Sequence, residues 1–91
     1  MDSVDVEIFG GKYTIKGDAD PEYVRQLARY VDDKMRMLAR KSPGTANPQK
    51  IAVLAALNIA DEFHRARRRH REIEDMVKQK TGDLFDALEE N

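Results

Sequence analysis

Apolar and polar residues alternate in two short stretches near the start of the chain. Residues 4–8 read VDVEI and residues 12–16 read KYTIK, and a period of two is typical of half-buried strands. Gly10 and Gly11 stand between the two runs, and a glycine pair at this position is typical of a two-residue hairpin loop. We therefore predict an antiparallel β-hairpin with Gly10-Gly11 as its loop.

This loop predicts the register of the hairpin. Ile8 would face Tyr13 on an apolar face, and Asp5 would face Lys16 on a polar face, where opposite charges stabilise a strand pair. An isolated hairpin is only marginally stable in water. We therefore expect its apolar face to pack against another element of the chain.

Apolar residues spaced three and four apart predict an amphipathic helix over residues 21–41. Asp20 followed by Pro21 is typical of a helix start, because the carboxylate caps free backbone N–H groups and proline suits the first helical position. Asp32 and Arg36 lie one turn apart with the acid first, which favours a stabilising pair. The apolar stripe consists of Val24, Leu27, Ala28, Val31, Met35 and Leu38.

The longest apolar run, IAVLAALNIADEF at residues 51–63, predicts a helix that is apolar on almost every side. Such a helix must be surrounded by other protein, and it is too short to span a bilayer, which needs about 20 apolar residues. Asn47 and Pro48 repeat the cap-then-proline start. No strong stop follows before Gly82, where the pattern leaves both continuation and a break open.

A heptad seam runs along this second helix, with positions spaced alternately three and four residues apart. Beyond Phe63 no other apolar stripe of the chain is left to cover it, so we expect a partner chain. The predicted fold is α+β: an N-terminal β-hairpin plus two helices, the second long and extending into an oligomerising coiled coil. We place a globular head at 1–63, with a helix at 21–41 and the start of the second helix at 48–63, and a coiled-coil tail at 64–91. The predicted oligomerisation residues are Ala56, Ile59, Phe63, Ala66, His70, Ile73, Val77 and Leu84.

Composition narrows the class of protein. The 91 residues carry 16 basic and 17 acidic side chains, for a net charge of -1, which gives no general attraction to nucleic acid or anionic membrane. There is no cysteine to form a disulfide or a thiolate metal site, and the N-terminus lacks the pattern of a signal peptide. We expect a single-domain soluble intracellular protein.

No catalytic or cofactor-binding constellation emerges from the residue pattern. His64 and His70 are six residues apart, which does not place them on one helical face, so we expect no metal site. Gly10-Gly11 is not followed by the lysine of a phosphate-binding loop. We therefore expect a protein that is not an enzyme and has no cofactor.

One run of charge has two interpretations. Residues 64–71 read HRARRRHR, which is either the solvated face of a coiled coil or a contact for nucleic-acid phosphates. The run has no interleaved aromatic residues for base stacking. Residues 83–90 carry four acids and no base, so antiparallel helices would place opposite charges side by side. The arginines of the run are Arg65, Arg67, Arg68, Arg69 and Arg71.

Three segments, VDVEIFGGKYTIKG, LARYVDDKM and AVLAALNIADE, in this order and spacing, resemble the ZapA family. That resemblance implies a hairpin-and-helix head, a long dimerising helix, and two dimers joined through antiparallel tails. It also implies binding to the tubulin-like division protein FtsZ, cross-linking of FtsZ filaments, and a cytoplasmic location at the mid-cell division site.

The resemblance further implies an FtsZ-binding surface on the head, near the loop between the helices. The alternative hypothesis is a small coiled-coil protein that binds nucleic acid or the nucleoid through residues 65–71. The candidate FtsZ contacts in this chain are Lys12, Arg36, Arg40, Lys41, Gln49 and Lys50.

Overall fold

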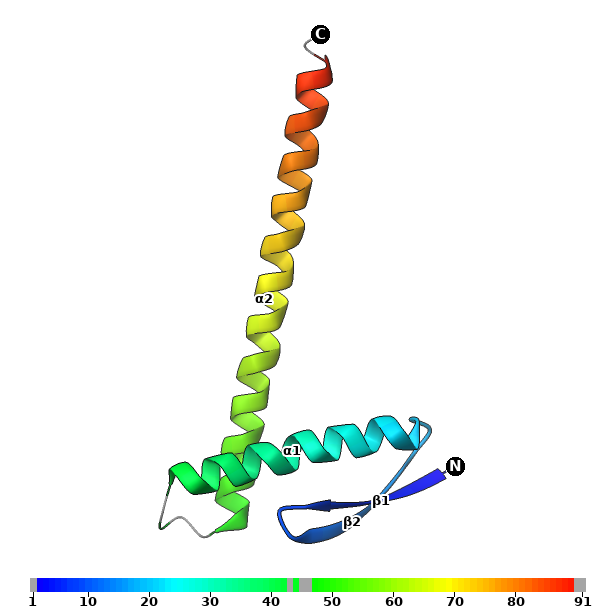
Figure 1. The fold of residues 1–91 in the computed structure, drawn as a ribbon, viewed down its shortest axis with the longest axis vertical. Coiled ribbons are helices and arrows are strands. Elements are labelled where there is room, and N and C mark those ends of the chain that lie inside the picture. Colours follow the sequence, from blue (N-terminus) through cyan, green and yellow to red (C-terminus); the bar gives the residue numbers. More distant parts are fainter. Residues whose placement is uncertain (1, 43, 45–46, 90–91) are drawn as a thin grey trace. The chain divides into compact units, whose positions relative to one another are not determined.

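The computed structural model describes the backbone of residues 2–42, 44 and 47–89, and the side chains of 3–42, 44 and 47–82. Two strands pair as an antiparallel hairpin and are followed by two helices (Figure 1). This is the predicted element order, and it confirms the α+β fold. The elements are β1 (Asp2–Ile8), β2 (Gly11–Gly17), α1 (Pro21–Lys41) and α2 (Pro48–Glu89).

The hairpin forms as predicted, but the predicted loop and register are wrong. The loop is Phe9-Gly10, so that Ile8 pairs with Gly11 and Asp5 with Thr14. The error is a shift of two residues, which leaves every side chain on its predicted face because the period of a strand is two. The expected charge pair between Asp5 and Lys16 is absent. Instead, the Thr14 hydroxyl donates a hydrogen bond to Asp5 Oδ1 at 2.7 Å.

A contact from α1 accounts for this turn. Phe9 and Gly10 have φ values of 50° and 79°, the left-handed pair that a tight hairpin turn requires. Non-glycine residues usually avoid this region. Phe9 is held in it by a 2.7 Å hydrogen bond that its N–H donates to Asp32 Oδ1. Gly11 then occupies the first position of β2, where an added Cβ would lie 2.7 Å from the Tyr13 hydroxyl oxygen.

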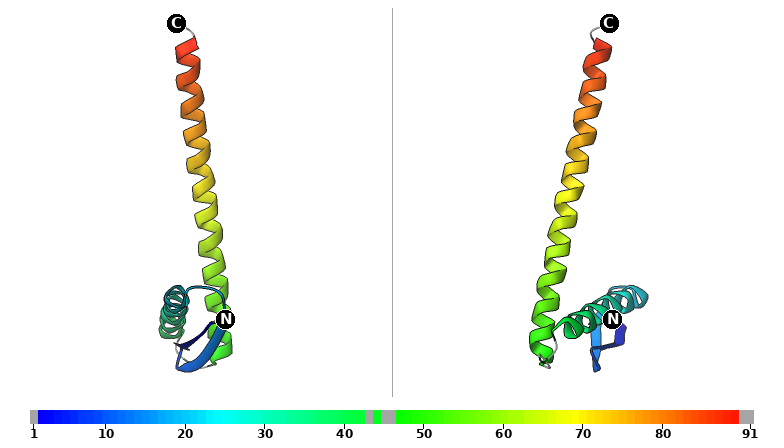
Figure 2. Two further views of the ribbon diagram at one scale, coloured as in Figure 1. Left: turned by 90° about the vertical axis from the view of Figure 1, so that its right-hand side faces the viewer. Right: turned by 60° about the vertical axis from the view of Figure 1, so that its left-hand side comes forward.

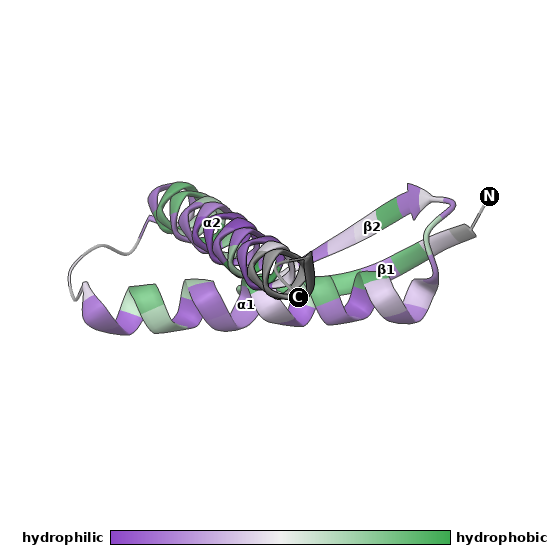
Figure 3. Ribbon diagram, turned by 90° about the horizontal axis from the view of Figure 1, so that it is seen from above, coloured by the Kyte–Doolittle hydropathy of each residue, from purple (hydrophilic) through white to green (hydrophobic). Residues whose placement is uncertain are grey.

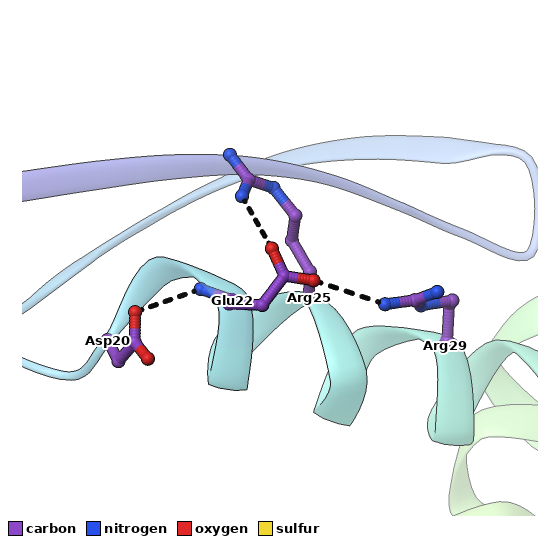
Figure 4. Close-up of polar contacts among 4 residues, drawn as sticks. All are labelled: Asp20, Glu22, Arg25 and Arg29. Atoms are coloured by element: carbon purple, nitrogen blue, oxygen red, sulfur yellow. Dashed lines mark hydrogen bonds and ion pairs between the residues drawn. The ribbon is translucent and has the colours of Figure 1, made fainter.

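The start of α1 follows the predicted capping pattern. The Glu22 N–H donates to Asp20 Oδ1 at 3.2 Å, and Pro21 occupies the first helical turn. The Glu22 carboxylate lies 3.3 Å from the Arg25 guanidinium and 3.6 Å from that of Arg29 (Figure 4). These ion pairs are exposed, so each contributes only about 0.2–1 kcal/mol, and they lie at the end of the helix farthest from the α1–α2 loop.

The hairpin packs on α1 through β1. Figure 2 shows the hairpin beside α1 in both views, and Figure 3 colours β1 hydrophobic where it runs along the helix. Val4, Val6 and Ala28 are buried together. Strand β2 is less covered by α1. Its Tyr13 and Ile15, which lie on the same face of the hairpin as Val4 and Val6, are 53% and 42% exposed.

A second core cluster joins the end of α1 to the first turns of α2. Met35, Ile51 and Ala55 are buried in it, and Phe9 of the hairpin turn packs against their edge. Most of the predicted α1 stripe lies in the two clusters. Leu27 is the exception at 48% exposed, because it lies at the margin of the stripe and no other part of the described chain covers it.

Helix α2 begins at its predicted cap, where the Gln49 N–H donates to Asn47 Oδ1 at 2.9 Å. It continues through Gly82 to Glu89, which resolves the alternative that the sequence left open. The chain divides into two compact units, Met1–Asn58 and Ile59–Asn91. The predicted limit of the head at residue 63 stays a prediction.

Candidate interaction surfaces

The first turns of α2 expose an apolar surface within the first unit. Only Ile51 and Ala55 of this helical segment are buried by the chain itself. Val53, Leu54 and Leu57 are 55%, 42% and 64% exposed. Because neighbouring exposed apolar side chains are uncommon on monomeric proteins, this surface indicates contact with another chain.

The predicted seam is open in the second unit. Phe63, Ile73 and Val77 are 56%, 53% and 57% exposed, and no described part of this unit covers them. Burying one such side chain completely contributes about 1.5–3 kcal/mol. A partner helix along the seam would therefore gain several kcal/mol from a few positions.

The other predicted seam residues are also accessible to a partner. Ala56 and Ala66 are exposed, and Ile59 is half-buried. His70 Nε2 lies 2.8 Å from Glu74 Oε1, so this polar seam position is held by its own helix. The side chain of Leu84 lies outside the described residues.

An open apolar groove of about 620 Å³ lies in the first unit, where the hairpin turn meets α1 and α2. Ala52, one helical turn before the seam residue Ala56, is part of its wall. The groove therefore adjoins the seam and extends the apolar surface available to a partner. Its lining includes Phe9, Tyr13, Ile15, Val31, Met35, Pro48, Gln49 and Ala52.

Asp32 links the hairpin turn to α1. Its Oδ1 accepts the Phe9 N–H, and its Oδ2 lies 2.9 Å from Arg36 Nε. The Phe9 N–H, and after it the Arg36 side chain, lower the pKa of the Asp32 carboxyl. The hydrogen bond to Asp32 in turn raises the pKa of Arg36. We call this arrangement the Asp32 latch.

The candidate FtsZ contacts on α1 are of two kinds. Arg36 is engaged in the Asp32 latch, so its guanidinium already has a structural role. Arg40 and Lys41 are exposed in the last turn of the helix, where positive charge is favoured by the helix dipole. These two side chains are available to a partner.

The remaining candidates lie on the hairpin and on α2. Lys12 is exposed on β2 and pairs across the strands with Glu7. Gln49 and Lys50 are exposed in the first turn of α2. The groove brings the hairpin turn and this first turn together, because Gly11 and Gln49 both line it.

The Asp32 latch and the groove do not follow from the sequence. Helical spacing predicts the pair of Asp32 and Arg36, but nothing in the local pattern indicates a contact with a turn 23 residues earlier. Among the described residues, no helix is long and apolar enough to cross a membrane. The same residues contain no group of three or more potential metal-ligating side chains.

Together, these features define a self-associating interaction protein: a hairpin-and-helix unit whose last helix presents an open apolar seam. The comparisons with known proteins assign the family. The family model "Cell division protein ZapA" matches residues 4–90. The chain belongs to the ZapA family of cell division proteins.

Individual relatives agree with this assignment. Cell division protein ZapA of Geobacillus kaustophilus (strain HTA426) is 39% identical over 84 residues, which are 91% of each chain. The solved ZapA mutant dimer from Geobacillus stearothermophilus is 35% identical with a TM-score of 0.65, covering 85% of this chain and 88% of that one. The solved structure of an "unknown conserved bacterial protein" from Pseudomonas aeruginosa PAO1 is 26% identical with a TM-score of 0.81, and the match covers 100% of each chain.

Membership in this family makes the chain a cell division protein. The dimeric state of the Geobacillus stearothermophilus relative supports self-association of this chain as well. The open seam on α2 is the surface that such an association would cover.

Proposed function

We propose that this protein binds FtsZ and cross-links its filaments without catalysing a reaction. In this proposal the protein works in the cytoplasm at the mid-cell division site, where it promotes and stabilises the Z-ring. The observation that carries the proposal is the open seam of Phe63, Ile73 and Val77, which calls for a second chain. A protein with two or more FtsZ-binding units on one assembly can hold two filaments together.

The assembly we propose is a dimer that pairs again through its tails. One partner helix along the seam buries the apolar positions and forms the dimer. The basic residues 64–71 and the acidic residues 83–90 then favour an antiparallel dimer of dimers, because each basic block meets an acidic block. Exposed ion pairs contribute only about 0.2–1 kcal/mol each, so the charges select orientation more than they add stability.

The head supplies the FtsZ contacts in this proposal. The accessible candidates are Lys12, Arg40, Lys41, Gln49 and Lys50, which are all exposed. Exposed charges give weak individual contacts. Several heads on one assembly raise the apparent affinity without any new contact, so binding and bundling depend on the assembly.

Sedimentation of polymerised FtsZ tests the head surface. Arg40→Ala/Lys41→Ala removes two charges at the end of α1, and it should reduce the amount of protein that sediments with the filaments. Arg25→Ala/Arg29→Ala is the matched control, because it removes two exposed charges from the other end of the same helix. Equal loss in both variants, or none in the first, would contradict this placement of the FtsZ contacts.

A further inference from the structure

We propose that a basic face of α2, formed by His64, Arg67, Arg68 and Arg71, binds the phosphate backbone of duplex nucleic acid. The four side chains are spaced by three, one and three residues, which places them on one side of a helix. They line an open depression of about 390 Å³. The structure therefore gathers part of the arginine run into one surface.

The charges of the basic face are not neutralised within the described part of the chain. No acidic partner is found there for Arg67, Arg68 or Arg71, and the Arg67 guanidinium lies 5.6 Å from the centre of the Phe63 ring. Two of the nearby acids, Asp61 and Glu74, are engaged by other bases, and no ion pair joins Glu72 or Asp75 to the basic face among the described residues. Asp61 Oδ2 lies 3.0 Å from Arg65 Nε, and Glu74 is held by His70.

The outer part of the basic face points away from the seam. At about 100° per residue, Arg68 and Arg71 lie about 165° and about 105° from the middle of the stripe of Phe63, Ala66 and His70. Arg67 lies about 65° from it and contacts the Phe63 ring, so it flanks the seam. A partner helix that covers the seam leaves Arg68 and Arg71 exposed on each helix of a dimer.

The chemistry of the basic face favours phosphates over other partners. Interfaces with nucleic acid are polar and strongly positive, which matches a face of three arginines and one histidine. Guanidinium groups also match phosphate oxygens in shape and hydrogen bonding. Single strands are disfavoured, because their binding sites stack bases on aromatic rings, and the nearby Phe63 belongs to the seam and is contacted by Arg67.

Salt dependence of binding measures the number of phosphate contacts. In fluorescence anisotropy with a labelled DNA duplex of about 24 base pairs, three arginine contacts predict a slope of log affinity against log salt of about −2.7. The affinity should then fall about forty-fold between about 50 and 200 mM salt. With Arg68→Gln/Arg71→Gln, one contact remains, and the same change of salt should cost only about three- to four-fold.

Arg65→Gln/Arg69→Gln is the matched control, because it removes two charges from the same run but from outside the basic face. It should keep the steep slope. The inference is overturned if the full-length protein does not bind the duplex at low salt. It is also overturned if the slope of log affinity against log salt decreases by the same amount in both variants. It is also overturned if polyglutamate displaces the duplex at an equal concentration of charge, since an acidic protein surface would then be the better ligand.

The test is independent of the proposed FtsZ binding. Circular dichroism should show that both variants keep the helix content of the wild type. Each variant removes two charges of the basic block, so sedimentation velocity should show the same assembly for the two variants, and the comparison of DNA binding is made between them. Because the basic face lies outside the head candidates, Arg68→Gln/Arg71→Gln should still sediment with FtsZ filaments. Loss of DNA binding with retained FtsZ binding supports the inference, and loss of both assigns these arginines to FtsZ and contradicts it.

Discussion

Replacing Asp32 with alanine should loosen the hairpin turn from α1. The Asp32 carboxylate accepts the Phe9 N–H at 2.7 Å and lies 2.9 Å from Arg36 Nε. Phe9 itself has a φ of 50° and packs against the cluster of Met35 and Ile51. The substitution removes the acceptor of the Phe9 N–H.

The expected loss follows from these contacts. A hydrogen bond to a charged acceptor contributes about 1.5–3 kcal/mol, and the left-handed backbone of Phe9 costs about the same with or without Asp32, so it does not add to the difference. We expect Asp32→Ala to lower the free energy of unfolding by about 1.5–3 kcal/mol. This is a large fraction of the roughly 5–15 kcal/mol that is typical of a folded domain.

Urea denaturation followed by circular dichroism at a fixed protein concentration measures this loss. Asp33→Ala is the control, because Asp33 is exposed on the same turn of α1 and should stay within about 0.5 kcal/mol of the wild type. Asp32→Asn keeps an acceptor oxygen and should fall between the two. If Asp32→Ala is no less stable than Asp33→Ala, the latch does not hold the turn.

Three further predictions concern pH, the tail helix and the assembly. The Phe9 N–H, and after it Arg36, lower the pKa of Asp32, so the Asp32 carboxylate stabilises the fold above the usual pKa of about 3.9, and this stabilisation is lost as the pH falls through the folded-state pKa. Asp32→Asn should therefore make the free energy of unfolding less sensitive to acid. An unchanged dependence on pH would contradict the lowered pKa. Gly82→Ala places a Cβ in open space within α2, so it should stabilise the helix by about 1 kcal/mol, seen as a higher thermal midpoint, and a lower midpoint would argue against a continuous helix. Replacing the four acids of residues 83–90 with lysine should convert tetramers toward dimers at low salt. Exchanging the five arginines of residues 65–71 for glutamate in the same chain should restore the tetramers. If analytical ultracentrifugation shows no restored tetramer, the charge blocks do not set the orientation.

Local patterns in the sequence were sufficient to predict where both helices begin. Asp20-Pro21 and Asn47-Pro48 marked both helix starts, and the side chains of Asp20 and Asn47 accept hydrogen bonds from the predicted turns. Helix starts depend on residues next to each other in the chain, so they can be predicted from a short window. The α+β fold and the ZapA family were also predicted correctly.

The turn could not be predicted in the same way. Gly10-Gly11 is the stronger local signal for a hairpin loop, but the Asp32 contact from 23 residues away stabilises Phe9 in its place. Likewise, the run of residues 51–63 indicated a helix with apolar residues all round. The sequence did not indicate that the chain itself would bury only Ile51 and Ala55 of it.

The functional surfaces were predictable to different degrees. The seam follows from periodicity alone, and the exposure of Phe63, Ile73 and Val77 agrees with a need for a partner. The FtsZ contacts came from the family resemblance and stay a prediction. The arginine run was visible in the sequence, but its division into a basic face and paired flanking residues depends on the positions of side chains on α2.

The central claim is that self-association through the α2 seam makes an FtsZ-binding protein into a cross-linker. Ile73→Glu tests it most directly, because a partner helix over this position would bury an unpaired charge, at a cost of several kcal/mol. Electron microscopy of polymerised FtsZ should show bundles with the wild-type protein and separate filaments with Ile73→Glu, whose dissociation is checked by light scattering. Bundling at wild-type strength by the dissociated variant would contradict the account.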